Sequence, residues 1–195
     1  MNIETLMKEL QLDTRLDVKD IPDIDLYMDQ VIQLFEKKFS PAKRNEEEKV
    51  LTKTMINNYA KGKLFFPIKN KKYSRDHIML ISMIYQMKGA LSIHDVKQTL
   101  EPLNNKIVNE EIDLLSLYMS YLTLFDQNLE LFKHDVHQHI EEAHSEAAKI
   151  GDKEEAYLVK LLLVTTFTEL SNFYRKAAEK LVDDLMEEAP KGKKE

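Results

Sequence analysis

The sequence predicts a mainly all-α protein, in which a small head that contains one short β-hairpin is followed by a helical domain of long antiparallel helices. Only four Gly and five Pro occur among the 195 residues, too few for the many turns of an all-β fold. Leu, Met, Lys and Glu, which all favour helix, dominate the composition. The length suits one domain, or a small domain with a helical appendage, and allows a real core.

The composition also excludes several kinds of site. The chain has no Cys, which excludes disulfides, thiolate metal sites and cysteine nucleophiles. No apolar run approaches the roughly 18 residues of a membrane span, and the N-terminal stretch MNIETLMKELQLD lacks the basic and apolar regions of a signal peptide. The sequence has no Gly-rich phosphate loop and no nucleophile motif. We therefore expect a cytoplasmic protein that is not an enzyme, holds no cofactor and has no membrane partner.

Charge is unevenly distributed along the chain, whose net charge is -6. Residues 1–42 carry a net charge of -4, residues 43–100 of +7 and residues 101–195 of -9. The stretch 49–75 contains eight basic residues and neither Asp nor Glu. A basic middle between acidic ends indicates that one module carries a site for a polyanion. The acidic ends are expected to limit non-specific binding to nucleic acid.

The first part of the chain predicts an N-terminal extension, residues 1–19, with a short helix over 2–11. Pro22 then interrupts the chain, because a residue before proline disfavours the helical conformation. A helix is expected over roughly 24–39, capped by Asp23 or Asp25. Its apolar positions have helical spacing and are Leu26, Tyr27, Val31, Leu34, Phe35 and Phe39. Residues 42–48 are polar and indicate a solvated link.

A second helix and a hairpin follow. Thr52 can cap a helix over 53–62, which Gly62 ends as the natural C′ residue. Residues 64–66 form a short apolar β-like run, and residues 68–72 suit a hairpin tip in which Asn70 tolerates a positive φ.

Two further helices complete the head, residues 20–103. Ser74 caps a helix over 75–88, and Ser92 caps a shorter one that Pro102 closes. Helix, turn, short hairpin and a new helix, in this order, are what a winged helix-turn-helix domain needs.

The remaining residues predict a helical domain, 104–188, for dimerisation or effector binding, and a disordered tail, 189–195. Apolar positions from 108 to 150 follow a heptad-like spacing, which indicates a long packing helix. Residues 126–128 leave open whether this is one helix or two. A turn at Gly151-Asp152 leads to a last helix over 153–188. The heptad positions suit a homodimer, an intramolecular hairpin, or both.

The exposed face of the helix over 53–62 and the wing over 65–73 are the candidate DNA-binding site. Asn pairs with adenine in bidentate fashion, Thr contacts the thymine methyl, and basic groups hold phosphates. The candidate residues are Thr52, Lys53, Thr54, Asn57, Asn58, Lys61, Lys69, Lys71, Lys72, Tyr73 and Arg75. The alternative is that a Lys-rich loop is ordinary solvated surface.

Three stretches of the head resemble regulators of the MerR type. LTKTMINNYAKGKLFFP resembles the second helix and turn of that family, with Leu51, Thr52, Ile56, Tyr59 and Leu64 at matching places. KKYSRDHIMLISMI resembles the end of its wing and its third helix, and ALSIHDVKQTL its next helix. The usual Arg of the recognition helix is Asn57 here, and the usual Gly before Leu64 is Lys63.

The wider pattern LYMDQV, then TKTMINNYAK, then KKYS-x-x-H, is more similar still to an uncharacterised bacterial family, described as a domain of unknown function with a MerR-like head. This resemblance runs from about Asp20 to Leu103. The resemblance implies a transcriptional regulator that binds double-stranded DNA as a homodimer, with a small-molecule effector still to be identified. The alternative is a protein-interaction module on a winged-helix scaffold without DNA binding. A third hypothesis is a metal-responsive regulator that uses His134, His137 and Glu141, against which stand ordinary surface histidines.

Overall fold

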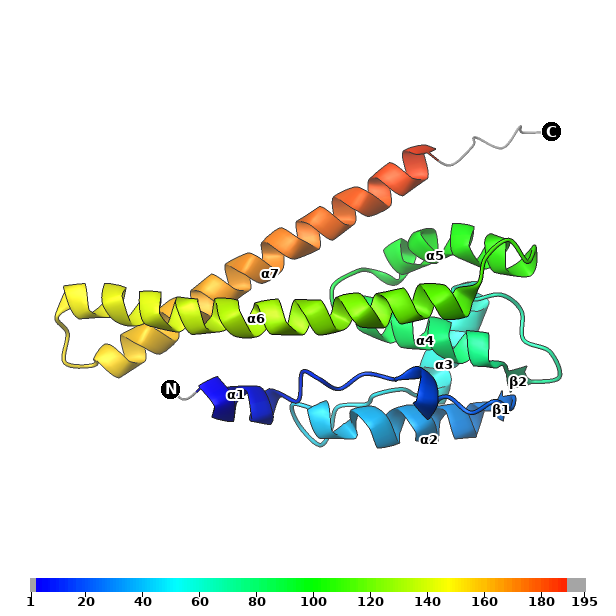
Figure 1. Cartoon of the computed structure of the whole chain (residues 1–195), viewed down its shortest axis with the longest axis horizontal. Coiled ribbons are helices and arrows are strands. Elements are labelled where there is room, and N and C mark those ends of the chain that lie inside the picture. The colour runs from blue at the N-terminus through cyan, green and yellow to red at the C-terminus, as the bar shows by residue number, and fades with distance from the viewer. Residues whose placement is uncertain (1–2, 189–195) are drawn as a thin grey trace. The chain divides into compact units, whose positions relative to one another are not determined.

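The computed structural model describes residues 3–188, and within them the protein is mainly helical (Figure 1). The predicted tail, 189–195, lies outside the described residues. The chain divides into two compact units. Among the described residues, the head unit comprises 14–122 and 178–188, and the hairpin unit comprises 3–13 and 123–177. None of the described helices is both long enough and apolar enough to cross a membrane.

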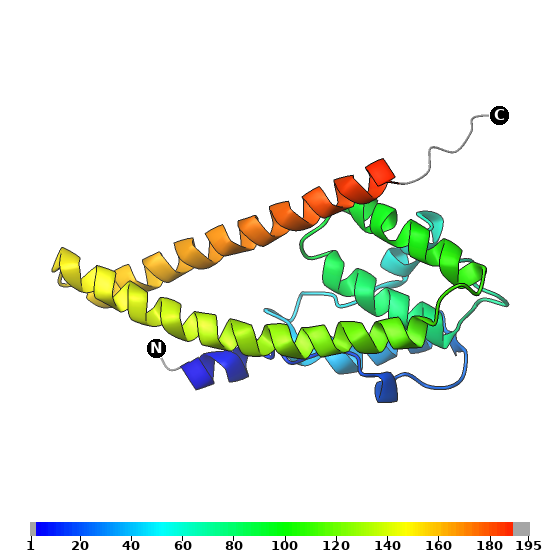
Figure 2. The same ribbon diagram turned by 45° about the horizontal axis from the view of Figure 1, so that its top comes forward.

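The head unit contains most of the elements. These are η1 (Val18–Asp20), β1 (Leu26–Tyr27), α2 (Met28–Phe39), η2 (Ser40–Ala42), α3 (Lys53–Lys61), β2 (Lys72–Tyr73), α4 (Arg75–Met87), α5 (Ile93–Val108) and the first turns of α6 (Leu114–Ile150). Figures 1 and 2 show α2 to α5 gathered against the beginning of α6. Their apolar faces share one core, in which Phe35, Ile56 and Ile78 are almost fully buried.

The helix expected over 24–39 begins four residues later, at Met28. Leu26 and Tyr27 instead form β1, which pairs antiparallel with β2 so that Leu26 lies opposite Tyr73. The prediction that Asp23 or Asp25 caps the helix was therefore wrong. Tyr27 is the N-cap residue, and its N–H donates to the side-chain oxygen of Gln30 over 2.8 Å. The strand pairing holds the preceding residues extended and moves the start of the helix.

The hairpin wing is also smaller than expected. Residues 64–66 form no strand, and the strand partner of β2 is β1, from the N-terminal side of α2. A single bridge between Lys69 and Lys72 closes the tip. The structure therefore has a tight turn and a two-stranded sheet in place of a hairpin built from 65–73 alone.

Two helix boundaries after α4 differ from the prediction. Pro102 does not end the last expected helix of the head, because α5 continues through it to Val108. The long helix expected from 104 begins at Leu114, after a turn in which Glu110 has a φ of 58°. The head unit accordingly extends past residue 103, where we expected it to end. Because Pro lacks an N–H, α5 lacks one backbone hydrogen bond at Pro102.

The helix α6 is continuous across residues 126–128, which answers whether 104–150 contains a break there. Its first turns face the head core through Leu114, Tyr118 and Leu122, of which only Leu122 is an expected heptad position, whereas Met119, another expected position, is exposed. The Tyr118 hydroxyl donates to the Leu16 carbonyl over 2.7 Å and lies 3.0 Å from Ser82 Oγ. Burial raises the pKa of Tyr118 to about 12.

The hairpin unit consists of α1 (Ile3–Leu10), most of α6 and the first part of α7 (Glu155–Glu188). Gly151 makes the turn with a φ of 68°, as its position between the two helices predicted. The expected heptad positions 136, 140, 143 and 147 are all buried here, against Val159 and Leu163 of α7. Leu6 and Met7 of α1 pack against the same cluster.

Candidate nucleic-acid interface

The helix α3 turns a polar face to solvent and an apolar face to the head core. Ile56 and Tyr59 are buried, whereas Asn57 and Asn58, which alternate with them, are exposed. Thr52 caps the helix as predicted, since its hydroxyl accepts a hydrogen bond from the Met55 N–H over 3.1 Å. The half-buried Thr52 hydroxyl, which was predicted to contact DNA, therefore already accepts a hydrogen bond from the helix backbone.

The turn after α3 has a different geometry from the predicted one. Gly62 has a helical φ of -73°, and Lys63 takes the left-handed conformation with a φ of 57°. Gly62 is required by space instead, because a Cβ there would lie 2.8 Å from Leu64 Cδ1. Leu64 is buried, and its carbonyl accepts from the side-chain amide of Asn104 in α5 over 3.0 Å. These contacts set the direction in which the chain leaves α3.

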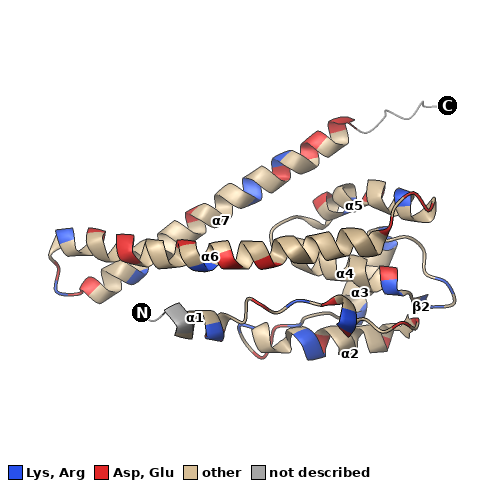
Figure 3. Cartoon of the chain, viewed as in Figure 1, with Lys and Arg blue, Asp and Glu red and all other residues tan. Residues whose placement is uncertain are grey.

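The basic tip lies between Lys69 and Lys72. The Lys72 N–H donates to the Lys69 carbonyl over 2.9 Å, and Asn70 and Lys71 both have positive φ, 52° and 59°. Two consecutive positive φ values define a type I′ turn, in which Asn is a favoured first residue. The turn leaves the side chains of Lys69 and Lys71 exposed, and Figure 3 shows basic residues along the segment that enters β2.

His77 attaches the segment before the tip to α4. It is 3% exposed, its Nδ1 accepts from the Ser74 N–H over 3.1 Å, and its Nε2 lies 3.1 Å from the Phe66 carbonyl. A backbone N–H must donate and a carbonyl must accept, so the neutral ring carries its proton on Nε2. Burial lowers the pKa of His77, against the opposing effects of the Phe66 hydrogen bond and the carboxylates of Asp76 and Asp25.

An acidic segment, residues 23–29, contacts three of the predicted site residues. Asp29 pairs with Lys53 at 2.8 Å, and Asp23 pairs with Arg75 at 3.0 Å. The ammonium group of Lys72 lies over the ring of Tyr27, 5.2 Å from its centroid. Sequence reasoning missed this segment as part of the site. The negative charge of residues 1–42 was the only signal of it, and the β1–β2 pairing brings it there.

Tyr73 is not available at the surface. It is 1% exposed, and its ring packs edge-on against Phe65 and His77. Tyr73 was predicted to belong to the DNA-binding surface, and this was wrong as regards exposure. Successive side chains of a strand point to opposite sides, and on β2 the Tyr73 side chain is the one that points into the core.

Six of the predicted residues remain exposed and make no side-chain hydrogen bond or ion pair with any described residue. They are Thr54, Asn57, Asn58 and Lys61 on α3, and Lys69 and Lys71 at the tip. Three ammonium groups and two side-chain amide groups can therefore donate hydrogen bonds from this surface, and the two amide oxygens and the Thr54 hydroxyl can accept them. Such a set suits an anionic, hydrogen-bonding partner.

The histidine candidates lie in the hairpin unit. His137 Nε2 is 3.4 Å from Glu141 Oε1, on one face of α6 as the spacing predicted. Within residues 3–188, no group of three or more metal-ligating side chains converges there or elsewhere. His139, the next histidine along, is instead held by Glu142 at 3.0 Å.

The fold and surface define a mainly α-helical protein whose head presents a polar helix face beside a basic turn. The chain belongs to the family described as "Domain of unknown function (DUF1836)", which matches residues 16–121. The match covers nearly the whole first segment of the head unit and ends where α6 passes into the hairpin unit. No curated protein and no solved structure matches the chain.

Proposed function

We propose that the protein is a cytoplasmic DNA-binding transcriptional regulator of MerR-like type, with α3 in the major groove and the basic tip on the phosphate backbone. The observation that carries the proposal is the exposed face of α3. Thr54, Asn57, Asn58 and Lys61 extend from a helix whose opposite face is anchored in the core, and no described side chain occupies their polar groups.

The chemistry of this face suits base edges. Asn57 and Asn58 each present both an amide donor and an acceptor, the combination that pairs with adenine. Thr54 adds a methyl group for thymine, and Lys61 a charge for guanine or phosphate. The short side chains allow the helix backbone to approach the groove floor closely.

The tip has the complementary role. Lys69 and Lys71 carry unpaired charges on a turn whose shape is set by Asn70 and by the His77 contacts behind it. A rigid basic turn holds phosphates at a defined register relative to the helix and carries no sequence information itself.

The test is selection of duplex DNA from a random library by the purified full chain, followed by affinity measurements at several salt concentrations. Lys69→Ala/Lys71→Ala is expected to weaken binding to all sequences and to reduce the salt slope by about 0.9 for each lost phosphate contact. Asn57→Ala is expected to cost about 1–3 kcal/mol on the selected site only, with binding to unrelated DNA retained.

The matched control is Lys153→Ala/Lys160→Ala, which removes two exposed lysines of the hairpin unit and the same total charge. It is expected to leave the salt slope unchanged. If no sequence is enriched, or if the tip variant and the control behave alike, the assignment of α3 and the tip to DNA fails.

A second candidate function is a protein-interaction module without DNA binding. It is favoured by the acidic segment 23–29, which already neutralises Lys53 and Arg75 and covers Lys72 with Tyr27. A polyanion must compete with these contacts, of which the Asp29–Lys53 pair is exposed on both sides and therefore weak. No enriched DNA together with a stable protein partner would support this function.

We further propose that the regulator is a homodimer. On α7, Tyr157, Leu161 and Val164 are 59%, 43% and 63% exposed. Their spacing places them on one face, turned away from the face that holds Val159 and Leu163. Sedimentation equilibrium tests this: the wild type is expected to be a dimer and Leu161→Glu/Val164→Glu a monomer.

A further inference from the structure

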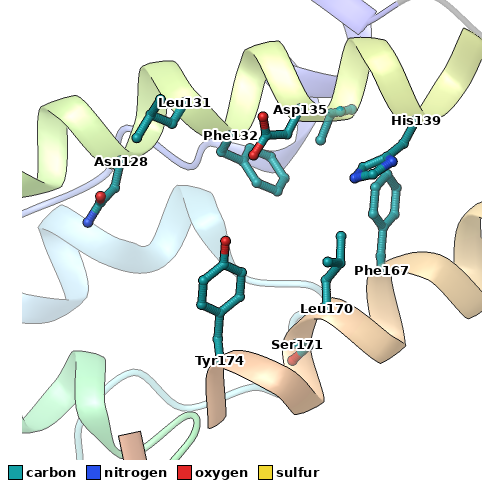
Figure 4. Close-up of a pocket in the computed structure, with 10 residues that line it drawn as sticks. Asn128, Leu131, Phe132, Asp135, His139, Phe167, Leu170, Ser171 and Tyr174 are labelled. Atoms are coloured by element: carbon teal, nitrogen blue, oxygen red, sulfur yellow. The ribbon is translucent and has the colours of Figure 1, made fainter. Parts of the chain in front are cut away.

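A cavity of about 520 Å³ lies between α6 and α7 inside the hairpin unit (Figure 4). Leu170 and Tyr174 extend from α7 toward α6, and Phe132 and Asp135 reach from α6 into the same space. The volume falls within the roughly 300–1,000 Å³ of small-molecule sites. His139 and Phe167 close one end, their rings edge-on with centroids 6.1 Å apart.

The walls of this cavity are apolar and aromatic. Phe132, Phe167 and Tyr174 surround it together with Leu131 and Leu170. Leu131 and Tyr174 are 61% and 73% exposed, so the cavity opens widely to solvent. Covering large apolar side chains that are exposed to water with an apolar ligand is favourable, because it removes apolar surface from water.

The charge of the lining has one sign. Asp135 is its only acidic residue, and no described residue pairs with its carboxylate. Neither Lys nor Arg lines the cavity, and the only basic group, His139, has its Nδ1 3.0 Å from a carboxylate oxygen of Glu142. Asn128 and Ser171 add neutral polar groups.

We propose that this cavity binds a lipophilic organic cation, with its apolar body between Phe132, Leu170 and Tyr174 and its positive charge near Asp135. A cation gains from the carboxylate and from the faces of the aromatic rings, whereas an anion of the same shape meets only repulsion. The site goes beyond the proposed DNA-binding function and does not depend on it, because every lining residue belongs to the hairpin unit.

A second copy of the chain is the competing occupant. The exposed stripe of Tyr157, Leu161 and Val164 lies on a different face of α7 from Leu170 and Tyr174, so dimerisation through the stripe leaves the cavity open. The unpaired Asp135 also argues against a second apolar helix, which would bury this carboxylate without a partner.

The experiment is calorimetric titration of the full chain with tetraphenylphosphonium at pH 8. Tetraphenylborate, which has the same shape and the opposite charge, is the ligand control. We expect one tetraphenylphosphonium per chain and at least tenfold weaker binding of tetraphenylborate. Asp135→Asn keeps the shape of the side chain and is expected to weaken cation binding roughly two- to fivefold.

Two further variants separate the site from general charge effects. Tyr174→Ala removes a ring that is 73% exposed, so it is expected to weaken binding without unfolding the unit. Glu169→Gln removes one exposed carboxylate of α7 that does not line the cavity, and is expected to bind as the wild type does.

Three results would overturn the proposal. Equal affinity for the two ions, or an unchanged affinity in Asp135→Asn, would make the cavity merely apolar. No binding at millimolar concentration would mean that the cavity is closed in solution. Dissociation of a dimer by Tyr174→Ala in sedimentation would identify a second copy as its occupant.

Discussion

Replacing His77 with Phe tests how the tip is attached to the head. Phe fills the ring position among Phe65, Phe66 and Tyr73, but it can neither accept from the Ser74 N–H nor donate to the Phe66 carbonyl. The apolar contacts are therefore retained while two polar partners are lost. The effect of the substitution isolates the hydrogen bonds from the packing.

The magnitude follows from the two groups left without a partner. A part-buried donor or acceptor that loses its partner costs about 1–3 kcal/mol, so the loss of two partners is expected to lower the unfolding free energy by roughly 2–6 kcal/mol near pH 8. The cost is local to residues 64–77, because only this segment is joined to α4 through the ring. Backbone amides of the tip are therefore expected to exchange faster with solvent.

The dependence on pH gives a second measure. Burial depresses the pKa of His77 in the folded protein below its ordinary value of 6.5, so the folded state favours the neutral ring. The stability that this ring contributes is present above pH 6.5 and is lost as the pH falls below it. Protonation also places a hydrogen on Nδ1, against the Ser74 N–H.

The assay is urea unfolding followed by circular dichroism, together with hydrogen exchange of peptides from residues 62–80, at pH 8 and pH 5. The gap in stability between wild type and His77→Phe is expected to narrow at pH 5. His94→Phe, at an exposed position near the start of α5, is the control and should leave both measurements unchanged. A gap that stays constant, or widens, refutes the assigned role of the neutral ring.

Three further substitutions test other parts of the head. Lys63→Gly is expected to stabilise it by about 1 kcal/mol in urea unfolding, because Lys63 has a φ of 57°; a loss of stability would contradict this. Tyr118→Phe should cost about 1–3 kcal/mol by leaving the Leu16 carbonyl without its donor. Since the folded pKa of Tyr118 is about 12, this difference is present below pH 10 and should vanish as the pH rises through 12. If the head binds DNA, Asp23→Asn should tighten binding at low salt by freeing Arg75, and unchanged affinity would exclude competition between them.

Local signals predicted the features that depend on neighbouring residues. Thr52, Ser74 and Ser92 were expected to cap helices, and each side chain accepts the hydrogen bond of an N–H three residues on. Such caps join residues within one turn, so the order of residue types is sufficient to identify them. The exposed face of α3 and the turn at Gly151 were predictable for the same reason.

Other features depend on residues that are distant in the chain. Lys63 rather than Gly62 takes the left-handed conformation, and the Leu64 carbonyl that follows is held by Asn104, forty residues further along the chain. Whether α5 continues through Pro102 depends on whether the packing of the residues that follow offsets the loss of one backbone hydrogen bond. No local pattern distinguishes these outcomes.

By itself the sequence determined the helical class, the caps, the basic stretch 49–75 and the polar side chains of α3. Only the tertiary structure decided that β1 pairs with β2, and with it that acidic residues 23–29 lie against Lys53, Lys72 and Arg75. It also decided that Asp135 lies beside an aromatic cavity with no ion-pair partner among residues 3–188. The physical reason is that helix caps and periodicity are set within a few residues, whereas the partner of a charge is set by whichever distant segment the folded core brings beside it.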